Sequence, residues 1–252
     1  MTSKRIGNVE IVEISELKEG ALLINGLPDV GLVGSIAASF LAEKLNMYDI
    51  GYIDSDLLPP VVVFHKEEMK MPLRIMSDGS RAVLLSEVAL PPEALAPLAR
   101  SIVEWAISRK VARIISLGGL PTPNRMDVEK PEVGGLGVLK EDREFLKSHG
   151  VRTLSEGFLA GIYALIAKEA YRRGQSCIIL LAESHLNYPD PGAAASVLET
   201  LDKLFGVSVD VKPLLEKAEE LRVKLRELMR RTTETLRVSN KGYEYTPPLM
   251  YR

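Results

Sequence analysis

Short apolar runs bounded by glycine or proline alternate along most of this chain with longer segments in which apolar residues recur at helical spacing. The short runs predict strands and the longer segments predict helices. Their alternation is typical of βαβ units around a largely parallel sheet, and it fits one doubly wound α/β domain. The predicted strands cover 21–25, 61–65, 73–77, 82–87, 113–117 and 176–182, and the predicted helices cover 33–45, 93–108, 157–171 and 192–205.

A different pattern begins after residue 210. From residue 211 to residue 236 the sequence predicts a long charged helix, on which apolar residues are spaced by alternating steps of four and three. This spacing places a narrow seam on one side of the helix, as in a coiled coil. The seam either packs on its own domain or pairs with another subunit, in which case it contributes to oligomerisation. Its members are Leu214, Ala218, Leu221, Leu225, Leu228 and Thr232.

The end of the chain forms a third region. Ser239-Asn240-Lys241-Gly242 predicts a helix stop and a hinge, and tyrosine and proline are frequent beyond it. Fully extended, residues 238–252 reach roughly 50 Å at about 3.3 Å per residue. Because chain ends are usually frayed and featureless, an end rich in aromatic and aliphatic residues indicates binding to a partner. The sequence therefore predicts a core domain over 1–210, a C-terminal helix over 211–237 and a flexible docking tail over 238–252.

Composition narrows the classes of protein. The chain has 252 residues, 46% of them hydrophobic and 26% charged, as in a globular protein with a substantial core. A net charge of −2 gives no basic field for nucleic acid. No run approaches the roughly 18 apolar residues of a membrane span and no signal peptide is apparent, so we expect no membrane partner and a cytoplasmic location. Cys177, the single cysteine, lies in an apolar run and is interpreted as a buried structural thiol.

A glycine-rich turn over residues 26–34 follows a predicted strand and opens a predicted helix, where phosphate sites are built from free backbone N–H groups. The turn lacks the spacing of a dinucleotide motif, and the chain contains no P-loop motif. Asp29 also stands at its mouth, where a carboxylate would repel a phosphate. We therefore expect these glycines to serve a tight turn and close helix–sheet packing, and we expect no nucleotide or other cofactor.

The histidines suggest no metal site, because His65, His149 and His185 lie far apart in sequence. Ser184-His185 would suit a hydrolase if Asp190 approached, but the G-x-S-x-G pattern of a nucleophile elbow is missing. The loop over 183–191 follows a predicted central strand, the usual ligand position in such sheets. An α/β enzyme or small-ligand-binding protein with clefts near Gly31 and His185 is therefore the alternative function.

Five segments, taken in order, resemble the proteasome-assembly-chaperone family, in particular its archaeal homologues. Many relatives carry glycine where this chain has Asp29, which weakens any ligand role for the turn. The resemblance implies a three-layer α/β/α sandwich with a mostly parallel sheet, related to nucleoside phosphorylase-like folds. It also implies a homo-oligomer that is not an enzyme. The resemblance spans about residues 5–225, and its segments are 26–34, 52–60, 117–121, 157–161 and 188–195.

The last residues carry a second resemblance. Met250-Tyr251-Arg252, behind Leu249, is similar to the C-terminal hydrophobic–tyrosine–any-residue motif with which proteasome activators enter pockets between α-subunits of the core particle. This implies an ATP-independent activator or assembly factor on the α-ring of the proteasome. In that role Met250 fills a groove, the Tyr251 ring packs, and the carboxylate of Arg252 pairs with a pocket lysine. Several tails on one oligomer would raise avidity by roughly 10²–10⁴.

Overall fold

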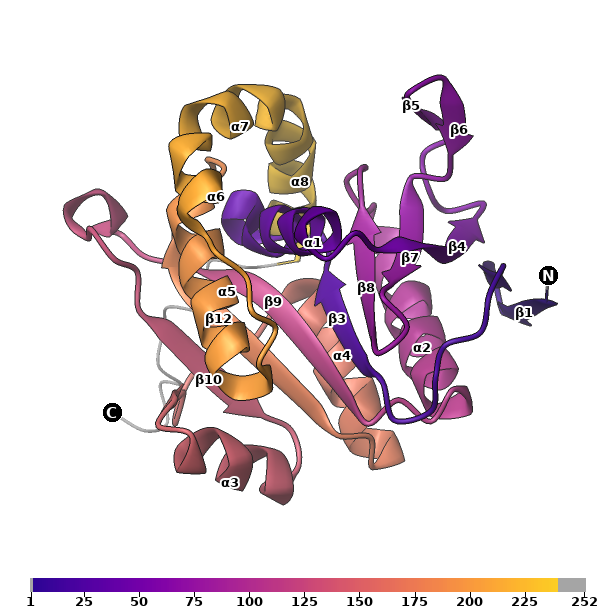
Figure 1. Ribbon diagram of the computed structural model, residues 1–252, viewed down its shortest axis with the longest axis horizontal. Helices are drawn as coiled ribbons and strands as arrows, with labels where there is room; N and C mark the ends of the chain where they lie inside the picture. Colours follow the sequence, from indigo (N-terminus) through magenta and orange to yellow (C-terminus); the bar gives the residue numbers. More distant parts are fainter. Residues whose placement is uncertain (1, 240–252) are drawn as a thin grey trace.

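The computed structural model describes residues 2–239, and its centre is a ten-stranded sheet (Figure 1). In spatial order the strands are β1 (Thr2–Ile6), β2 (Val9–Glu13), β4 (Tyr48–Ser55), β7 (Leu73–Ser77), β8 (Arg81–Ser86), β3 (Leu22–Gly26), β9 (Arg113–Pro121), β12 (Cys177–Ser184), β10 (Val133–Gly137) and β11 (Arg152–Thr153). Two further strands, β5 (Val63–His65) and β6 (Glu68–Lys70), pair only with each other and form a separate hairpin.

The middle of the sheet is parallel and its flanks are largely antiparallel. Strands β8, β3, β9 and β12 run parallel, and each is an apolar run because helices cover both faces of this part of the sheet. Strands β1, β2, β4 and β7 continue the sheet in antiparallel order on one side, and β10 pairs antiparallel with β12 on the other. The expected α/β fold with a mostly parallel sheet is confirmed, and the antiparallel flanks are an addition to it.

Helices cover both faces of this sheet. α1 (Val33–Lys44) and α5 (Pro191–Phe205) lie on one face, and α2 (Pro92–Ser108) and α4 (Gly161–Arg173) lie on the other. α3 (Lys140–Ser148) packs beside β10 at the edge, and two short 3-10 turns, η1 (Val30–Leu32) and η2 (Arg125–Asp127), follow β3 and β9. The three layers of the expected sandwich are therefore present.

Two hydrophobic cores, one on each face, follow directly from the alternation of side chains along the strands. On β3, Leu23 enters the core under α2 and α4, whereas Ile24 enters the core under α1 and α5. The same alternation separates Ile114 from Ile115 on β9. Every central strand thus contributes to both cores, which explains why these strands are apolar throughout.

Candidate functional site

The residues predicted to dock, Leu249, Met250, Tyr251 and Arg252, lie outside the described residues. The last described helix is α8 (Arg226–Val238). Near its end the Thr235 hydroxyl donates a hydrogen bond of 2.8 Å to the Leu90 carbonyl, in the loop between β8 and α2. The last turns of α8 therefore lie beside this loop.

The segment before the tail is helical, as expected, but it is not straight. It consists of α6 (Lys212–Glu216), α7 (Ala218–Lys224) and α8, separated by single residues, Lys217 and Leu225, whose ψ angles are near zero. The three helices form an arch above α1 (Figure 1). The long helical segment expected here is present, and the structure adds two bends, at Lys217 and Leu225.

The seam residues face their own domain to different extents. Leu214 is fully buried in the core under α1 and α5, and Leu221, Leu225 and Leu228 are half-buried against the same core. A seam that bends at two points cannot form a long coiled coil, which requires a continuous helix. The part of Leu214, Leu221, Leu225 and Leu228 in oligomerisation stays a prediction. A partner that contacted these leucines would do so on the inner side of the arch.

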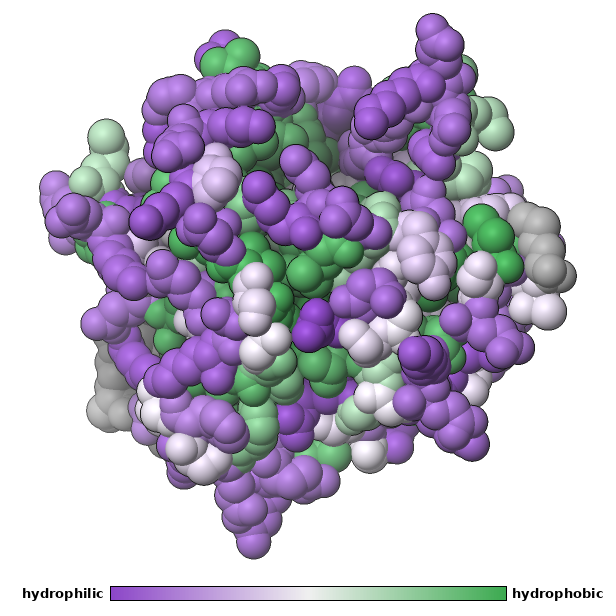
Figure 2. Space-filling view, in the orientation of Figure 1, coloured by the Kyte–Doolittle hydropathy of each residue, from purple (hydrophilic) through white to green (hydrophobic). Residues whose placement is uncertain are grey.

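A cleft of about 960 Å³ opens between the arch, α1, the ends of β7 and β8, and the β5–β6 hairpin. Its apolar lining includes the three half-buried seam leucines, and Figure 2 shows apolar side chains beneath the hydrophilic rim of the arch. A cavity of this size, apolar inside and polar at the rim, is typical of binding sites. The larger apolar lining residues include Ile36, Phe40, Met47, Met76, Leu85, Val88, Leu214, Leu221, Leu225 and Leu228.

The rim of the cleft is charged and predominantly basic. Several of its charges are engaged in ion pairs, including Arg231 with Glu227 at 2.8 Å. Arg74 pairs with Glu87 and Asp49, and Lys224 pairs with Glu220, so half of the cations that line the cleft are already paired with carboxylates. Six cations, Lys44, Lys66, Arg74, Lys217, Lys224 and Arg231, and three carboxylates, Glu43, Glu87 and Glu227, line the cleft.

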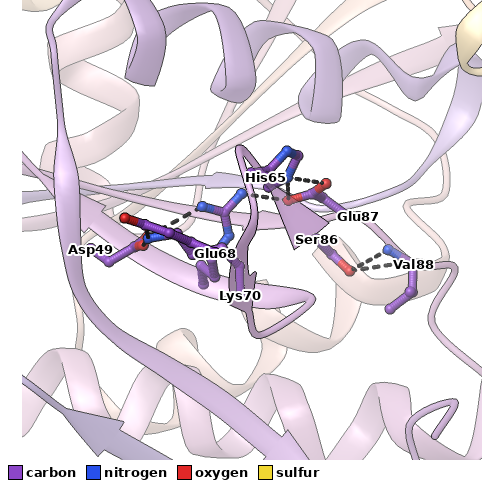
Figure 3. Close-up of polar contacts among 8 residues, drawn as sticks. Asp49, His65, Glu68, Lys70, Ser86, Glu87 and Val88 are labelled. Carbon is purple, nitrogen blue, oxygen red and sulfur yellow. Dashed lines mark hydrogen bonds and ion pairs between the residues drawn. The ribbon is translucent and has the colours of Figure 1, made fainter. Parts of the chain in front are cut away.

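One wall of the cleft is the hairpin, and a chain of charges joins this hairpin to the sheet (Figure 3). His65 Nε2 lies 2.9 Å from both carboxylate oxygens of Glu87, and Glu87 also pairs with Arg74. Arg74 contacts Asp49 at 3.3 Å, and Asp49 lies 3.2 Å from Lys70 on β6. Hydrogen bonds to Glu68 and Asp49 raise the pKa of Lys70. The chain of contacts fixes one face of the hairpin on the body.

The glycine turn is closely packed. A Cβ on Gly31 would lie 2.0 Å from Ser184 Oγ, and one on Gly34 would lie 2.1 Å from the Leu117 carbonyl oxygen. Gly31 also has a φ of 60°, a left-handed value that favours glycine. The Asp29 carboxylate is buried behind the turn. This geometry supports the interpretation of the glycines as packing residues, since Ser184 and His185 fill the space beside Gly31.

Around His185 the structure brings together the three groups that a hydrolase would need, but in other roles. The Asp190 carboxylate accepts hydrogen bonds of 2.8 and 3.0 Å from Arg125 and of 3.0 Å from the Ala193 backbone N–H. Ser184 Oγ donates to the His185 carbonyl at 3.3 Å. Asp190 is therefore an N-cap of α5 and an ion-pair partner.

The pKa shifts of His185 and Cys177 describe the two side chains here that could otherwise act in catalysis. Burial lowers the pKa of His185, an effect that Asp190 opposes and that Arg125 and Arg222 reinforce. Burial also raises the pKa of the Cys177 thiol, as does the nearby Asp142 carboxylate. Because the reactive form of cysteine is the thiolate, Cys177 is an inert structural residue, as its sequence environment predicts.

Arg125 is the residue of this region that sequence reasoning missed. It lies 65 positions before its partner Asp190, on η2, and its guanidinium also donates to the Val128 carbonyl at 2.6 Å. A Cβ on Gly192 would lie 3.0 Å from Arg125 Nη2, so this glycine leaves room for the guanidinium. The only local signal in the sequence is Asp190-Pro191, an N-cap residue followed by proline, which indicates the start of a helix but not the ion pair with Arg125.

Within residues 2–239 no group of three or more histidine, cysteine or acidic side chains is arranged to hold a metal ion. Over the same residues, none of the helices has both the length and the apolar composition needed to cross a bilayer.

The fold agrees with comparisons to known proteins. Over residues 23–229 the chain matches the PAC2 family, and it belongs to that family. Among solved structures it is similar to PbaA of Pyrococcus furiosus, an archaeal homolog of proteasome-assembly chaperone, with 35% identity and a TM-score of 0.84. That match covers 89% of this chain and 98% of PbaA. The expected family is thus confirmed, and it is one of chaperone type.

Two further relatives extend the comparison. Pyrococcus furiosus PbaB, an archaeal proteasome activator, matches with a TM-score of 0.74 and 23% identity, over 88% of this chain and 99% of PbaB. At this identity the match shows a shared fold. An uncharacterized protein of Methanocaldococcus jannaschii is 28% identical over 239 residues, which are 94% of this chain and 98% of the relative. Similarity therefore extends across nearly the whole length of the chain.

Proposed function

We propose that this protein is an ATP-independent proteasome-binding protein, an activator or assembly factor that docks on the α-ring of the core particle. The observation that carries the proposal is the similarity to PbaA over 89% of the chain. The resemblance of Met250-Tyr251-Arg252 to a proteasome-docking motif supplies the contact. In this proposal the protein works in the cytoplasm as a homo-oligomer and has no catalytic activity of its own.

The tail would bind by three contacts of different kinds. Leu249 and Met250 would fill an apolar groove, and the Tyr251 ring would pack while its hydroxyl forms a hydrogen bond. The carboxylate of Arg252 would pair with a lysine of an α-subunit. A charge-assisted contact of this kind typically contributes about 1.5–3 kcal/mol, or roughly 10- to 150-fold in affinity.

Binding to immobilised core particle tests the proposal. The intact chain should bind, and deletion of residues 250–252 or Tyr251→Ala should abolish or strongly weaken binding. A Gly-Ser extension after Arg252 keeps every side chain but displaces the carboxylate, so it should weaken binding about as much as Tyr251→Ala. Tyr245→Ala, in the same tail but outside the motif, and Arg252→Ala are the controls and should have small effects. Unchanged binding of the chain without residues 250–252 would refute the proposal.

Independence from nucleotide is tested with a fluorogenic peptide that the core particle hydrolyses. Any stimulation by this protein should be the same with and without ATP, because the chain has no P-loop motif and packs its glycine turn against Ser184. Stimulation that appears only with ATP would contradict this part of the proposal. The alternative function, an enzyme or small-ligand binder near Gly31 and His185, has less support because Gly31 leaves little space beside it.

A further inference from the structure

The cleft beneath the arch follows the length of α1. Its lining includes Ser35 and Ile36 on the first turn of this helix and Lys44 at its end. From Ser35 to Lys44 a helix rises roughly 14 Å, at about 1.5 Å per residue. The volume of about 960 Å³ is at the upper end of the range of roughly 300–1,000 Å³ that is typical of small-molecule sites. An elongated small molecule therefore matches the cleft in size and shape.

The charges around the cleft largely cancel one another. Arg74, Lys224 and Arg231 each pair with a carboxylate. A glutamate adjoins each of the other three lining cations in the sequence, at Glu43-Lys44, Lys66-Glu67 and Glu216-Lys217. A charged ligand would lose hydration on entering an apolar cleft and would find no unbalanced counter-charge there. The balance of charges therefore favours a neutral ligand.

The lining also contains a polar group without a partner. Ser35 is 5% exposed, and its Oγ forms no hydrogen bond with any other residue that the structure describes. Because a buried hydroxyl without a hydrogen bond is unfavourable, a polar group of a ligand would stabilise it. Much of the remaining lining is apolar, from Phe40 and Met47 on one side to Leu221 and Leu228 on the other. The cleft thus suits an apolar chain that carries one uncharged polar group.

Helix α7 is the part of the arch that is built to move. None of its residues is buried, whereas Leu214 of α6 and Met229 of α8 are each only 1% exposed. Its two neighbours in the chain are therefore anchored in the core, and α7 itself is held mainly at its bends, Lys217 and Leu225. The half-buried Leu221 of α7 lines the cleft, so a small movement of this helix would cover a ligand with apolar surface.

We propose that the cleft beneath the arch binds a neutral, chain-like apolar molecule with a hydroxyl group, and that α7 closes over it. Apolar contacts with α1 and with the seam leucines hold the chain, and Ser35 bonds the hydroxyl. Neither Gly31 nor His185 lines this cleft, so the site is distinct from the alternative one near those residues. The inference does not depend on binding to the proteasome.

Equilibrium dialysis of the full chain against decanol tests the chemistry of the ligand. One decanol should bind per chain, and octanol should bind roughly 15-fold more weakly, at roughly fourfold per methylene group. Decanoate and decylammonium have the same chain length but carry a charge, so each should bind about tenfold more weakly than decanol, or weaker still. Absence of decanol binding up to its solubility limit, or equal or tighter binding of either charged analogue, would overturn the proposal.

Substitutions in α7 and α1 test the place of binding. Leu221→Trp fills the cleft with a larger apolar side chain, and Leu221→Gln makes its wall polar, so both should weaken decanol binding strongly. Val223→Gln changes an exposed residue of the same helix that does not line the cleft, and this control should bind as the wild type does. Ser35→Ala should weaken binding roughly fivefold by removing one hydrogen bond. Unchanged binding by both Leu221 variants would place decanol elsewhere and refute the inference.

Hydrogen exchange tests the closure. Saturation with decanol should slow exchange of the backbone amides of α7, whereas those of α4, on the opposite face of the sheet, should exchange as before. In the Leu221→Trp variant decanol should have no such effect. If bound decanol left the exchange of α7 unchanged in the wild type, this helix would not close over the ligand.

Discussion

Removal of the Arg125 guanidinium tests the central ion pair of the loops at the carboxyl ends of β9 and β12. In Arg125→Met a side chain of similar length replaces one that is only 9% exposed, and the Asp190 carboxylate, 1% exposed, loses its charged partner. Asp190 keeps two backbone donors, the N–H groups of Ala193 at 3.0 Å and of His185 at 3.3 Å. The variant therefore leaves a buried carboxylate that is hydrogen-bonded but unneutralised.

The expected cost follows from this arrangement. Breaking a buried ion pair from one side typically destabilises a protein by about 3–5 kcal/mol. The two remaining backbone donors place Arg125→Met at the lower end, about 3 kcal/mol. For a domain of this size each kcal/mol lowers the melting temperature by roughly 2–4 °C, so a decrease of about 6–12 °C is expected.

Urea and thermal unfolding measure this difference, and two further variants separate its causes. Asp190→Asn keeps a good N-cap without the charge, so the double variant with Arg125→Met should be more stable than Arg125→Met alone. Lys130→Met removes a cation from the same loop whose ion pair with Glu199 is exposed, and it should cost no more than about 1 kcal/mol. The reasoning would be wrong if Arg125→Met lowered the free energy of unfolding as little as Lys130→Met does. It would also be wrong if the double variant were less stable than Arg125→Met alone.

Three other substitutions or measurements test buried groups. Tyr163→Phe should lower the free energy of unfolding in urea by about 1–3 kcal/mol, because the buried hydroxyl donates a 2.9 Å hydrogen bond to the Leu27 carbonyl, which would lose its partner. A thiol reagent should label Cys177 only as fast as the protein opens, so rapid labelling of the folded protein would contradict its burial. Burial lowers the pKa of His185 below its ordinary value of 6.5, so the unfolded chain binds the proton more readily and stability falls as the pH decreases through 6.5 toward the folded pKa. His185→Gln should reduce that fall, which pH-dependent unfolding would show.

The centre of the fold could be predicted from the sequence because its signals are local. The strand over residues 73–77 and the start of the helix at Val33 agree with the structure at the residue level. The outer strands β1, β2 and β4 were not predicted as strands. They mix charged and apolar residues, and they are strands because of their pairing: β1 and β2 form a hairpin, and β2 pairs with β4, which lies much further along the chain.

The candidate sites could be predicted less well than the fold, because they depend on contacts between residues that are distant in sequence. The predicted seam includes the buried Leu214 and Thr232, but it omits the buried Met229 and does not contain the bends at Lys217 and Leu225. Arg125 and Asp190 meet across two loops, and no spacing in the sequence connects them. Periodicity reports which side of an element is apolar, while its path in space is decided by the surface it covers.

The β5–β6 hairpin and the residues just before it are exposed, whereas their sequence is typical of a buried strand. Val61-Val62-Val63-Phe64 is a short apolar run of the kind that predicts a buried strand. In the structure only Val63 and Phe64 of that run enter a strand, which belongs to the hairpin outside the main sheet, and Phe64 is among the most exposed apolar residues described. Contacts of His65 with Glu87 and of Lys70 with Asp49 hold this apolar sequence in an exposed position. The pattern of apolar residues therefore predicted a strand at the right place, but its burial depends on tertiary contacts that the pattern does not contain.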